Sequence, residues 1–218
     1  MLLFCYMKHI FLTLVALCAL CAGAFAQDTW FCGEAGTKLD YIRKDAKGVV
    51  EGGQYQYVIK DKAVAGGKTT ITFDVVMPGG ASMAGCKVWT EGGLFHTDIN
   101  ASLGQFGEGL TAKGNSPILP ENPAVGADLG DCSVSIESLM LTSDYSKVRF
   151  TKHEKITVAA GEFDCWCLEY DTTDKVMGLK AQNHTEQWLA KGIGDVKVVT
   201  KDKKGRVVSE KELVKISK

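Results

Sequence analysis

The sharpest arrangement of reactive side chains in the sequence is Cys165-Trp166-Cys167. In a β-strand the two cysteines point to the same face, with their sulfur atoms roughly 6–7 Å apart at the rise of a strand. An extended strand does not easily close such a pair into one disulfide, so the geometry suits two separate partners across a sheet or a shared metal ion. Redox C-x-x-C pairs differ, because their nucleophilic thiol lies at a helix N-terminus that lowers its pKa. No such helix is predicted here.

The compartment decides what cysteines do, and residues 1–26 indicate export. A short basic segment precedes an apolar run over 10–21, and residues 24–26 form an A-x-A cleavage signal, which together are typical of a secretory signal peptide. The run is too short to span the roughly 30 Å hydrocarbon core of a bilayer as an anchor. A lipid anchor fits poorly, because leucine precedes both Cys18 and Cys21 where a small residue is expected.

Cleavage after residue 26 leaves five of the eight cysteines. In an oxidising compartment these five are disulfide candidates, and because their number is odd, one is left without a disulfide partner. Five ways to omit one thiol, times three pairings of the other four, allow about 15 two-bridge patterns, so the pairing stays open. The candidates are Cys32, Cys86, Cys132, Cys165 and Cys167.

Familiar catalytic motifs are missing from the sequence. The sequence has no H-E-x-x-H, Walker, G-x-S-x-G or dinucleotide-binding pattern, so no catalytic residue, metal or cofactor is predicted. His96 and Asp98 share one face of a predicted strand, where a surface contact is more common than a base or ligand pair. The sequence therefore indicates a protein that is not an enzyme. A thiol-based redox or metal-binding activity at Cys165 and Cys167 is the first alternative.

Composition and charge narrow the class further. The chain is 45% hydrophobic and 23% charged, which is ordinary for a globular protein, and its net charge of −1 gives no case for nucleic-acid binding. Basic residues gather in 187–218, with 9 Lys/Arg against 4 Asp/Glu. These lysines alternate with apolar residues, which favours the solvated face of terminal strands over a site for an anionic partner.

Apolar and polar residues alternate with period 2 through most of the chain, and turn sequences arrive every 8–15 residues. This pattern predicts roughly ten strands joined mostly as antiparallel hairpins, with little helix. The two β-rich halves are 37–99 and 132–217, joined by a Pro/Gly-rich connector at 114–131. Residues 100–112 form either one short helix or a glycine-broken loop. We expect one β-rich domain over 27–218, while one continuous sheet and two modules both remain open.

Aromatic residues on the predicted strands offer two interpretations. Tyr55, Tyr57, Trp166 and Trp188 belong either to a hydrophobic core, the commoner case, or to an exposed stripe that binds a glycan or lipid on a concave sheet.

Several short motifs resemble a known family in order and spacing. The stretch Thr157–Trp166 resembles a "T-x-A-G-x-F-x-C" strand–turn–strand of exported Bacteroidetes proteins of unknown function that are called TapB-like, which are related to a periplasmic domain-of-unknown-function family. Further matching stretches are 36–41, 86–98, 123–129, 188–197 and 202–206. The resemblance implies a strongly curled sheet, such as a β-roll or incomplete barrel, and no known activity. It also points to Cys86–Cys165 as one bridge.

The sequence thus predicts an exported protein of the periplasm or cell envelope of a Gram-negative bacterium, with no transmembrane segment after cleavage. Its expected role is to bind an unknown envelope component or a small ligand, or to act as a scaffold. The second alternative is a carrier of lipid or another apolar ligand, which requires a half-barrel cavity of several hundred Å3.

Overall fold

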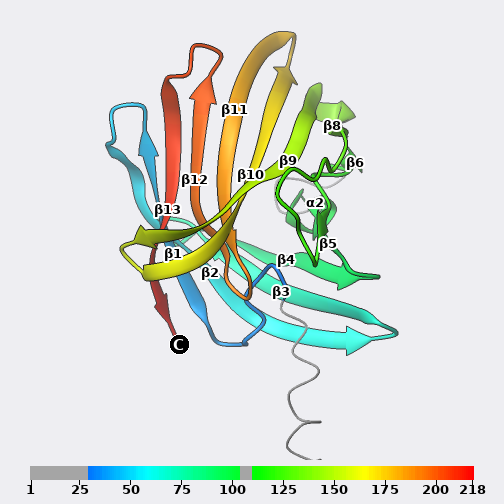
Figure 1. Cartoon of the computed structure of the whole chain (residues 1–218), viewed down its shortest axis with the longest axis vertical. Helices are drawn as coiled ribbons and strands as arrows, with labels where there is room; N and C mark the ends of the chain where they lie inside the picture. The colour runs from blue at the N-terminus through cyan, green and yellow to red at the C-terminus, as the bar shows by residue number, and fades with distance from the viewer. Residues whose placement is uncertain (1–28, 104–109) are drawn as a thin grey trace, which may run out of the picture.

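The structure, a computed structural model, describes residues 29–103 and 110–218 (Figure 1). The predicted signal peptide lies outside these residues. The fold is mainly β, as predicted, and one antiparallel sheet contains every strand of the described part of the chain. The strands are β1 (Lys38–Asp45), β2 (Val50–Ala65), β3 (Lys68–Val76), β4 (Ser82–Glu91), β5 (Leu94–Asp98), β6 (Lys113–Gly114), β7 (Leu119–Pro120), β8 (Cys132–Ile136), β9 (Leu141–Val158), β10 (Gly161–Val176), β11 (Leu179–Ala190), β12 (Gly194–Asp202) and β13 (Val207–Ser217). Helical turns are α2 (Ile99–Leu103) and the 3-10 turn η1 (Glu137–Leu139).

The strand order joins the two halves of the chain into one sheet. It runs β6-β8-β9-β10-β11-β12-β13-β1-β2-β3-β4-β5-β7, so the pairing of β13 with β1 lies in the middle. All the pairs are antiparallel, and most are hairpins between consecutive strands. One continuous sheet is therefore present rather than two separate modules.

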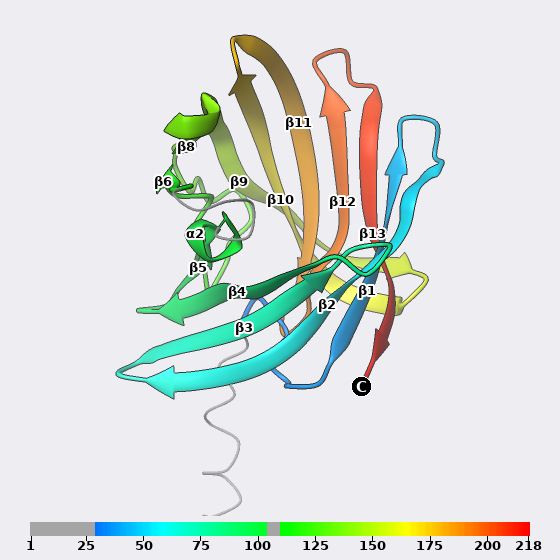
Figure 2. The same ribbon diagram turned by 180° about the vertical axis from the view of Figure 1, so that it is seen from behind.

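The sheet curls strongly, and its curl has a local cause. The register shifts within the β1–β13, β1–β2, β2–β3, β3–β4, β9–β10, β11–β12 and β12–β13 ladders. Each shift inserts an unpaired residue that bends the strand and increases its twist. As a result β2–β5 run at a steep angle to β10–β13 instead of extending their plane (Figures 1 and 2).

The predicted connector holds the two ends of the open sheet near each other. The sheet ends at β6 on one side and β7 on the other, and each of these edge strands is only two residues long. Only residues 115–118 separate them in the chain, a length that spans at most about 18 Å when extended. The gap in the sheet is therefore bridged by this short segment, which also lines the site described below.

The main core lies on the concave side of the curled sheet. It gathers alternate residues from both halves, including Leu39 and Tyr41 of β1, Ile71 of β3, Phe150 of β9 and Leu213 of β13, all at most 1% exposed. The period-2 pattern that predicts strands therefore also predicts which side chains meet here.

A second core lies on the opposite, outer side of β10–β12. The long β9–β10 hairpin bends so that its tip crosses over the outside of the sheet (Figure 1). Ile156 and Val158 from the hairpin pack there against Val196 and Val199 of β12. The indole N–H of Trp188 donates a 3.0 Å hydrogen bond to Glu154 of the hairpin. This second layer buries outer-face residues that would otherwise be exposed.

Candidate functional site

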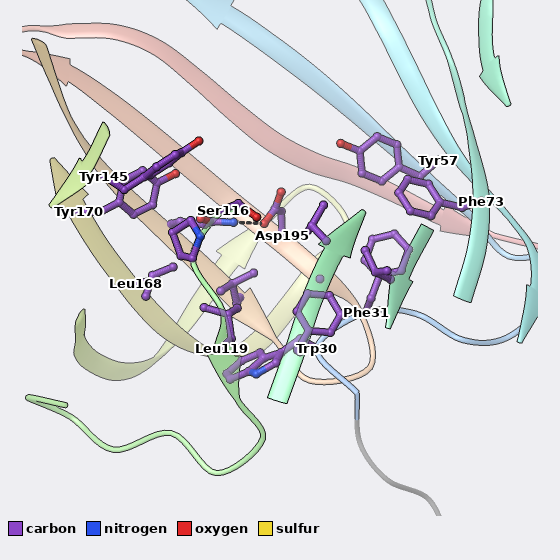
Figure 3. Close-up of a pocket in the computed structure, with 17 residues that line it drawn as sticks. Trp30, Phe31, Tyr57, Phe73, Ser116, Leu119, Tyr145, Leu168, Tyr170 and Asp195 are labelled. Carbon is purple, nitrogen blue, oxygen red and sulfur yellow. Dashed lines mark hydrogen bonds between the residues drawn. The ribbon is translucent and has the colours of Figure 1, made fainter. Parts of the chain in front are cut away.

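A cavity of about 290 Å3 opens on the concave side between the two halves of the sheet (Figure 3). Its walls are mostly aromatic and aliphatic, and its polar groups are few. The lining residues are Trp30, Phe31, Tyr57, Phe73, Val88, Phe95, Thr97, Ser116, Pro117, Leu119, Tyr145, Leu168, Tyr170, Gln187, Leu189, Gly194 and Asp195. A concave apolar site with a few converging polar groups is the usual form of a small-ligand pocket.

Alternation along the strands supplies most of the wall. Tyr57 on β2, Phe73 on β3, and Leu168 and Tyr170 on β10 each point inward, while their neighbours in sequence point outward. Phe31, Tyr57 and Phe73 contact one another, with ring centroids 4.7–6.2 Å apart. All three ring pairs are tilted, with interplanar angles of 41–45°, an arrangement that aromatic side chains favour over face-to-face stacking.

Trp30 fixes the segment that precedes β1 to the end of the pocket. Its ring stacks on Phe150 with centroids 5.5 Å apart, and its N–H donates to the carbonyl of Pro120 at 2.9 Å. The Lys191 ammonium lies 4.1 Å from the centroid of the indole. Sequence reasoning missed Trp30 and Phe31, because residues 29–36 have no strand-like alternation.

The polar end of the pocket is built around Asp195. Gln187 donates to one carboxylate oxygen at 2.6 Å, and Lys211 donates to the other at 2.6 Å. The Lys211 ammonium also lies 3.2 Å from the hydroxyl of Tyr57 and 4.5 Å from the ring centroid of Tyr41. The side chains of Lys211 and Asp195 are 17% and 20% exposed, so this ion pair is largely enclosed.

Neighbouring groups keep Lys211 charged, and burial keeps the nearby phenols neutral. Burial opposes the charge on Lys211, but Asp195 and the surrounding tyrosines outweigh it and hold the pKa of the ammonium well above its usual value. Burial raises the pKa of the Tyr170 hydroxyl, and it raises the pKa of Tyr55 to about 12. At neutral pH Lys211 and these phenols remain protonated, so none of them can serve as a base. The arrangement is suited to recognising a ligand by hydrogen bonds and apolar contact.

The structure separates the cysteines that the sequence singled out. Cys165 and Cys167 do share one face of β10, as predicted, and both are fully buried in the second core. Cys32 and Cys86 belong to the main core, whereas Cys132 is half-buried at the start of β8.

No disulfide joins cysteines within the described residues. The Cys86–Cys165 bridge that the family resemblance pointed to is not formed, because the two residues pack in different cores. Burial raises the pKa of the Cys165 thiol to about 12 and that of Cys167 to about 11. Such thiols carry almost no thiolate at neutral pH, which is the reverse of what a reactive pair needs.

The other sequence candidates are also placed by the structure. His96 stacks on Trp89 with ring centroids 4.9 Å apart, and burial lowers its pKa. Asp98 instead accepts the backbone N–H of Ala101 and so begins α2, which means that the two do not form a pair. Tyr57 lines the pocket, and Trp188 belongs to the second core.

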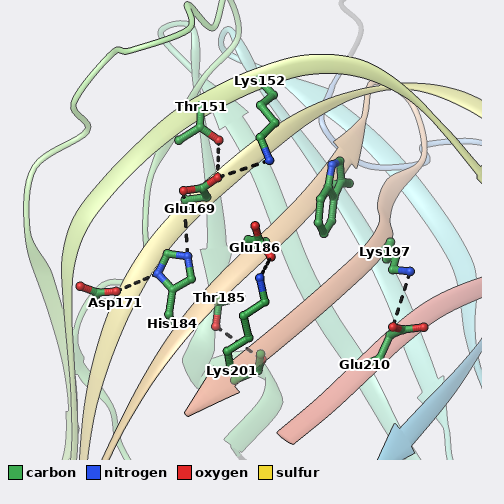
Figure 4. A network of polar contacts seen from close by, with 12 residues as sticks. Thr151, Lys152, Glu169, Asp171, His184, Thr185, Glu186, Lys197, Lys201 and Glu210 are labelled. Atoms are coloured by element: carbon green, nitrogen blue, oxygen red, sulfur yellow. Dashed lines mark hydrogen bonds and ion pairs between the residues drawn. The ribbon is translucent and has the colours of Figure 1, made fainter. Parts of the chain in front are cut away.

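A network of ion pairs covers the outer face of β10–β13 (Figure 4). His184 lies between Asp171 at 2.8 Å and Glu169 at 4.0 Å, and Thr151 donates to Glu169 at 2.7 Å. The basic C-terminal lysines face acidic partners here, as Lys197 faces Glu210 at 3.5 Å and Lys201 faces Glu186. This arrangement agrees with the solvated-face interpretation of the basic segment.

Among residues 29–103 and 110–218, no group of three or more His, Cys, Asp or Glu side chains is placed to hold a metal ion. None of the helices there is both long and apolar enough to cross a membrane.

The sequence and the fold both have recognisable relatives among known proteins. The sequence profile of the DUF3108-like family, a domain of unknown function, matches residues 34–213. The chain belongs to the DUF3108-like family. Curated proteins give no match.

Two solved structures share the fold. One is a candidate exported protein with a YmcC-like fold from Bacteroides fragilis, at 15% identity and a TM-score of 0.71, covering 86% of this chain and 98% of its own. The other is a candidate lipoprotein from Parabacteroides distasonis, at 20% identity and a TM-score of 0.67, covering 87% and 98%. These likenesses show that this fold also occurs in the two solved structures.

Proposed function

We propose that this chain is an exported binding protein of the bacterial cell envelope, without catalytic activity, and that the aromatic pocket is its ligand site. The observation that carries the proposal is the open pocket of about 290 Å3 on the concave side of the sheet, lined largely by side chains of the main core. Its aromatic walls suit the apolar body of a ligand, and the Asp195–Gln187–Lys211 end suits a polar group on it.

The size of the cavity favours a small ligand over a lipid. It has the volume of about ten water molecules at ~30 Å3 each, and it lies just below the ~300–1,000 Å3 range of small-molecule sites. A carrier for a long acyl chain is therefore the weaker alternative. A thiol-based activity is weaker still, because burial raises the pKa of Cys165 and Cys167 well above that of a reactive thiol.

The location is part of the same proposal. The signal-peptide pattern at 1–26 supports export, and both structural neighbours are described as exported or lipid-modified proteins of Bacteroidetes. We place this chain in the periplasm or envelope of a Gram-negative bacterium, as one β-rich domain over 27–218. The TapB-like assignment within the family is proposed on the same grounds.

Binding of the neutral fluorescent probe N-phenyl-1-naphthylamine to the purified protein tests the pocket. Thr97→Trp places a large ring at the cavity wall, whereas Lys87→Trp adds the same ring to an exposed position on neighbouring β4. We expect one probe per chain in the wild type and in Lys87→Trp, and none in Thr97→Trp. Equal binding by the two variants, or no binding by the wild type, would overturn the proposal.

A further inference from the structure

Exposed apolar side chains concentrate at one end of the sheet. Within the described residues, fourteen large apolar side chains are exposed, and nine of them lie in four turns at this end. We call these nine the apolar rim: Val49, Val50, Leu139, Met140, Val176, Met177, Leu179, Val207 and Val208. Exposed apolar residues scattered singly are normal, but a gathering of this kind marks an interaction surface.

The strand order explains why the four turns are neighbours. The β8–β9, β10–β11, β12–β13 and β1–β2 turns all fall at the same end, because β8 through β13, β1 and β2 are consecutive antiparallel strands of the sheet. Both views show the β10–β11, β12–β13 and β1–β2 tips in a row at the top (Figures 1 and 2). The rim is thus a row of projecting tips and not a flat face.

The two most prominent turns carry methionine where the backbone disfavours it. Met177 and Met140 have φ values of 49° and 45°, and the N–H of Met177 donates to the carbonyl of Met140 at 3.2 Å. Met177 and Gly178 form a two-residue turn with both φ positive, a position where asparagine is preferred. An exposed methionine, 70% accessible, at such a strained site indicates a use for its apolar side chain.

Two adjacent rim turns share the same sequence pattern and the same hydrogen bonds from the backbone to an aspartate. Residues 45–49 and 202–206 both read D-x-K-G-x, and in each the aspartate Oδ1 accepts the backbone N–H groups of the third and fifth residues at 2.8–3.0 Å. Both aspartates are thereby committed to the turn. Lys47 and Lys204 occupy the same place in the two turns, and exposed valines follow each.

The rim also carries positive charge that the protein leaves unneutralised. In the described part of the chain, Lys47, Lys180, Lys203 and Lys204 are exposed and have no carboxylate within 4 Å. Other lysines in the chain commonly face an acidic partner, as on the outer face of β10–β13. Lysine beside protruding apolar tips is complementary to an anionic lipid surface, which takes up both the charge and the apolar side chains.

We propose that the apolar rim docks this protein on the anionic surface of a lipid bilayer, with the four turns inserted at the headgroup level. The proposal does not depend on the pocket. A flat protein partner fits less well, because the apolar residues stand on projecting tips, and three of the four tips carry an exposed lysine.

Sedimentation with large unilamellar vesicles measures the docking. We expect the purified protein to bind vesicles of phosphatidylethanolamine and phosphatidylglycerol, to release from them in high salt, and to bind phosphatidylcholine vesicles weakly. Each lysine near an anionic surface contributes about 1 kcal/mol, or roughly a fivefold factor in the partition coefficient. Charge reversal of two rim lysines in K203E/K204E should therefore lower the partition coefficient at least about 25-fold. K87E/K215E changes two exposed lysines away from the rim and is the matched control.

A second pair of variants removes apolar area without harming the fold. M177N/L179T places asparagine where the turn prefers it, so stability should be kept while vesicle binding falls about tenfold or more. V64E alters an equally exposed valine, 69% accessible, on the β2–β3 hairpin and should leave binding unchanged. The proposal is overturned if the wild type ignores anionic vesicles, if rim variants bind like their controls, or if the rim variants instead abolish self-association.

Discussion

Replacing Lys211 by methionine should reveal how much the enclosed ion pair contributes to stability. The Lys211 and Asp195 charges lie 2.6 Å apart, which corresponds to an attraction of about 6 kcal/mol at an effective dielectric constant of about 20. Desolvation of both groups offsets much of that attraction. Lys211→Met leaves the Asp195 carboxylate with Gln187 as its remaining side-chain donor in the described structure.

We expect Lys211→Met to lower the free energy of unfolding by about 3 kcal/mol, as for loss of one partner from a buried pair. Lys197→Met is the matched control, because Lys197 faces Glu210 at 3.5 Å on the more open outer face and should cost less than about 1 kcal/mol. Urea unfolding followed by tryptophan fluorescence measures both. In the double variant D195N/K211M the loss should fall short of the sum of the single losses by about 1–3 kcal/mol.

The pH dependence gives an independent reading of the same pair. The folded protein holds the pKa of Lys211 above its unfolded value, so the contribution of this charge is complete below about pH 10 and is lost as pH rises through the folded pKa. The wild type should therefore lose stability above about pH 10.5 more steeply than Lys211→Met. Parallel curves for the two proteins, or a single-variant cost within about 0.5 kcal/mol of zero, would refute the reasoning.

Three further predictions concern other parts of the fold. Cys165 and Cys167, with pKa values raised to about 12 and about 11, should resist iodoacetamide at pH 8 in the native protein and react after urea unfolding; rapid native labelling of either would contradict their burial. Phe150→Ala removes a ring with 0% exposure that stacks on Trp30, and should cost about 3–5 kcal/mol in urea unfolding, with a loss under about 1 kcal/mol arguing against the packing. Gly114 and Gly126 share a φ of +86°, but only at Gly114 would an added Cβ lie 2.0 Å from the Ser133 carbonyl oxygen. Gly114→Ala should therefore lower the thermal unfolding temperature clearly more than Gly126→Ala. Equal decreases would exclude the close approach.

Much of the architecture could be predicted from the sequence, because strand alternation is a local signal. The runs around Tyr57, Ile71 and Cys165 each gave the face on which a side chain lies, and the curled antiparallel sheet followed from them together with the family resemblance. The connector at 114–131 was also recognised from its prolines. Its role in bridging the sheet edges was not, because edge pairing joins residues that no local pattern relates.

The site was less accessible to sequence reasoning for the same physical reason. Asp195 and Lys211 meet through the pairing of β12 with β13, and Trp30 reaches the pocket from a segment without any periodicity. The predicted pairing of the cysteines rests on the oxidising compartment and on the family resemblance. Neither of these indicates in which core a given thiol is buried. Bending of the β9–β10 hairpin over the outer face places Cys165 away from Cys86, and only the three-dimensional curl contains that information.

The central position of the β13–β1 pairing has a consequence for how the chain acquires its fold. When the chain emerges N-terminus first, β1 to β5 are available before the later strands. One edge of β1 then stays uncovered until β13, the last strand, has emerged. Until then β1 offers unpaired backbone groups along an edge that invites pairing with other chains. Because the β1–β13 pairing joins residues from nearly opposite ends of the sequence, we expect folding to be slow and to finish only after the C-terminal strand has emerged.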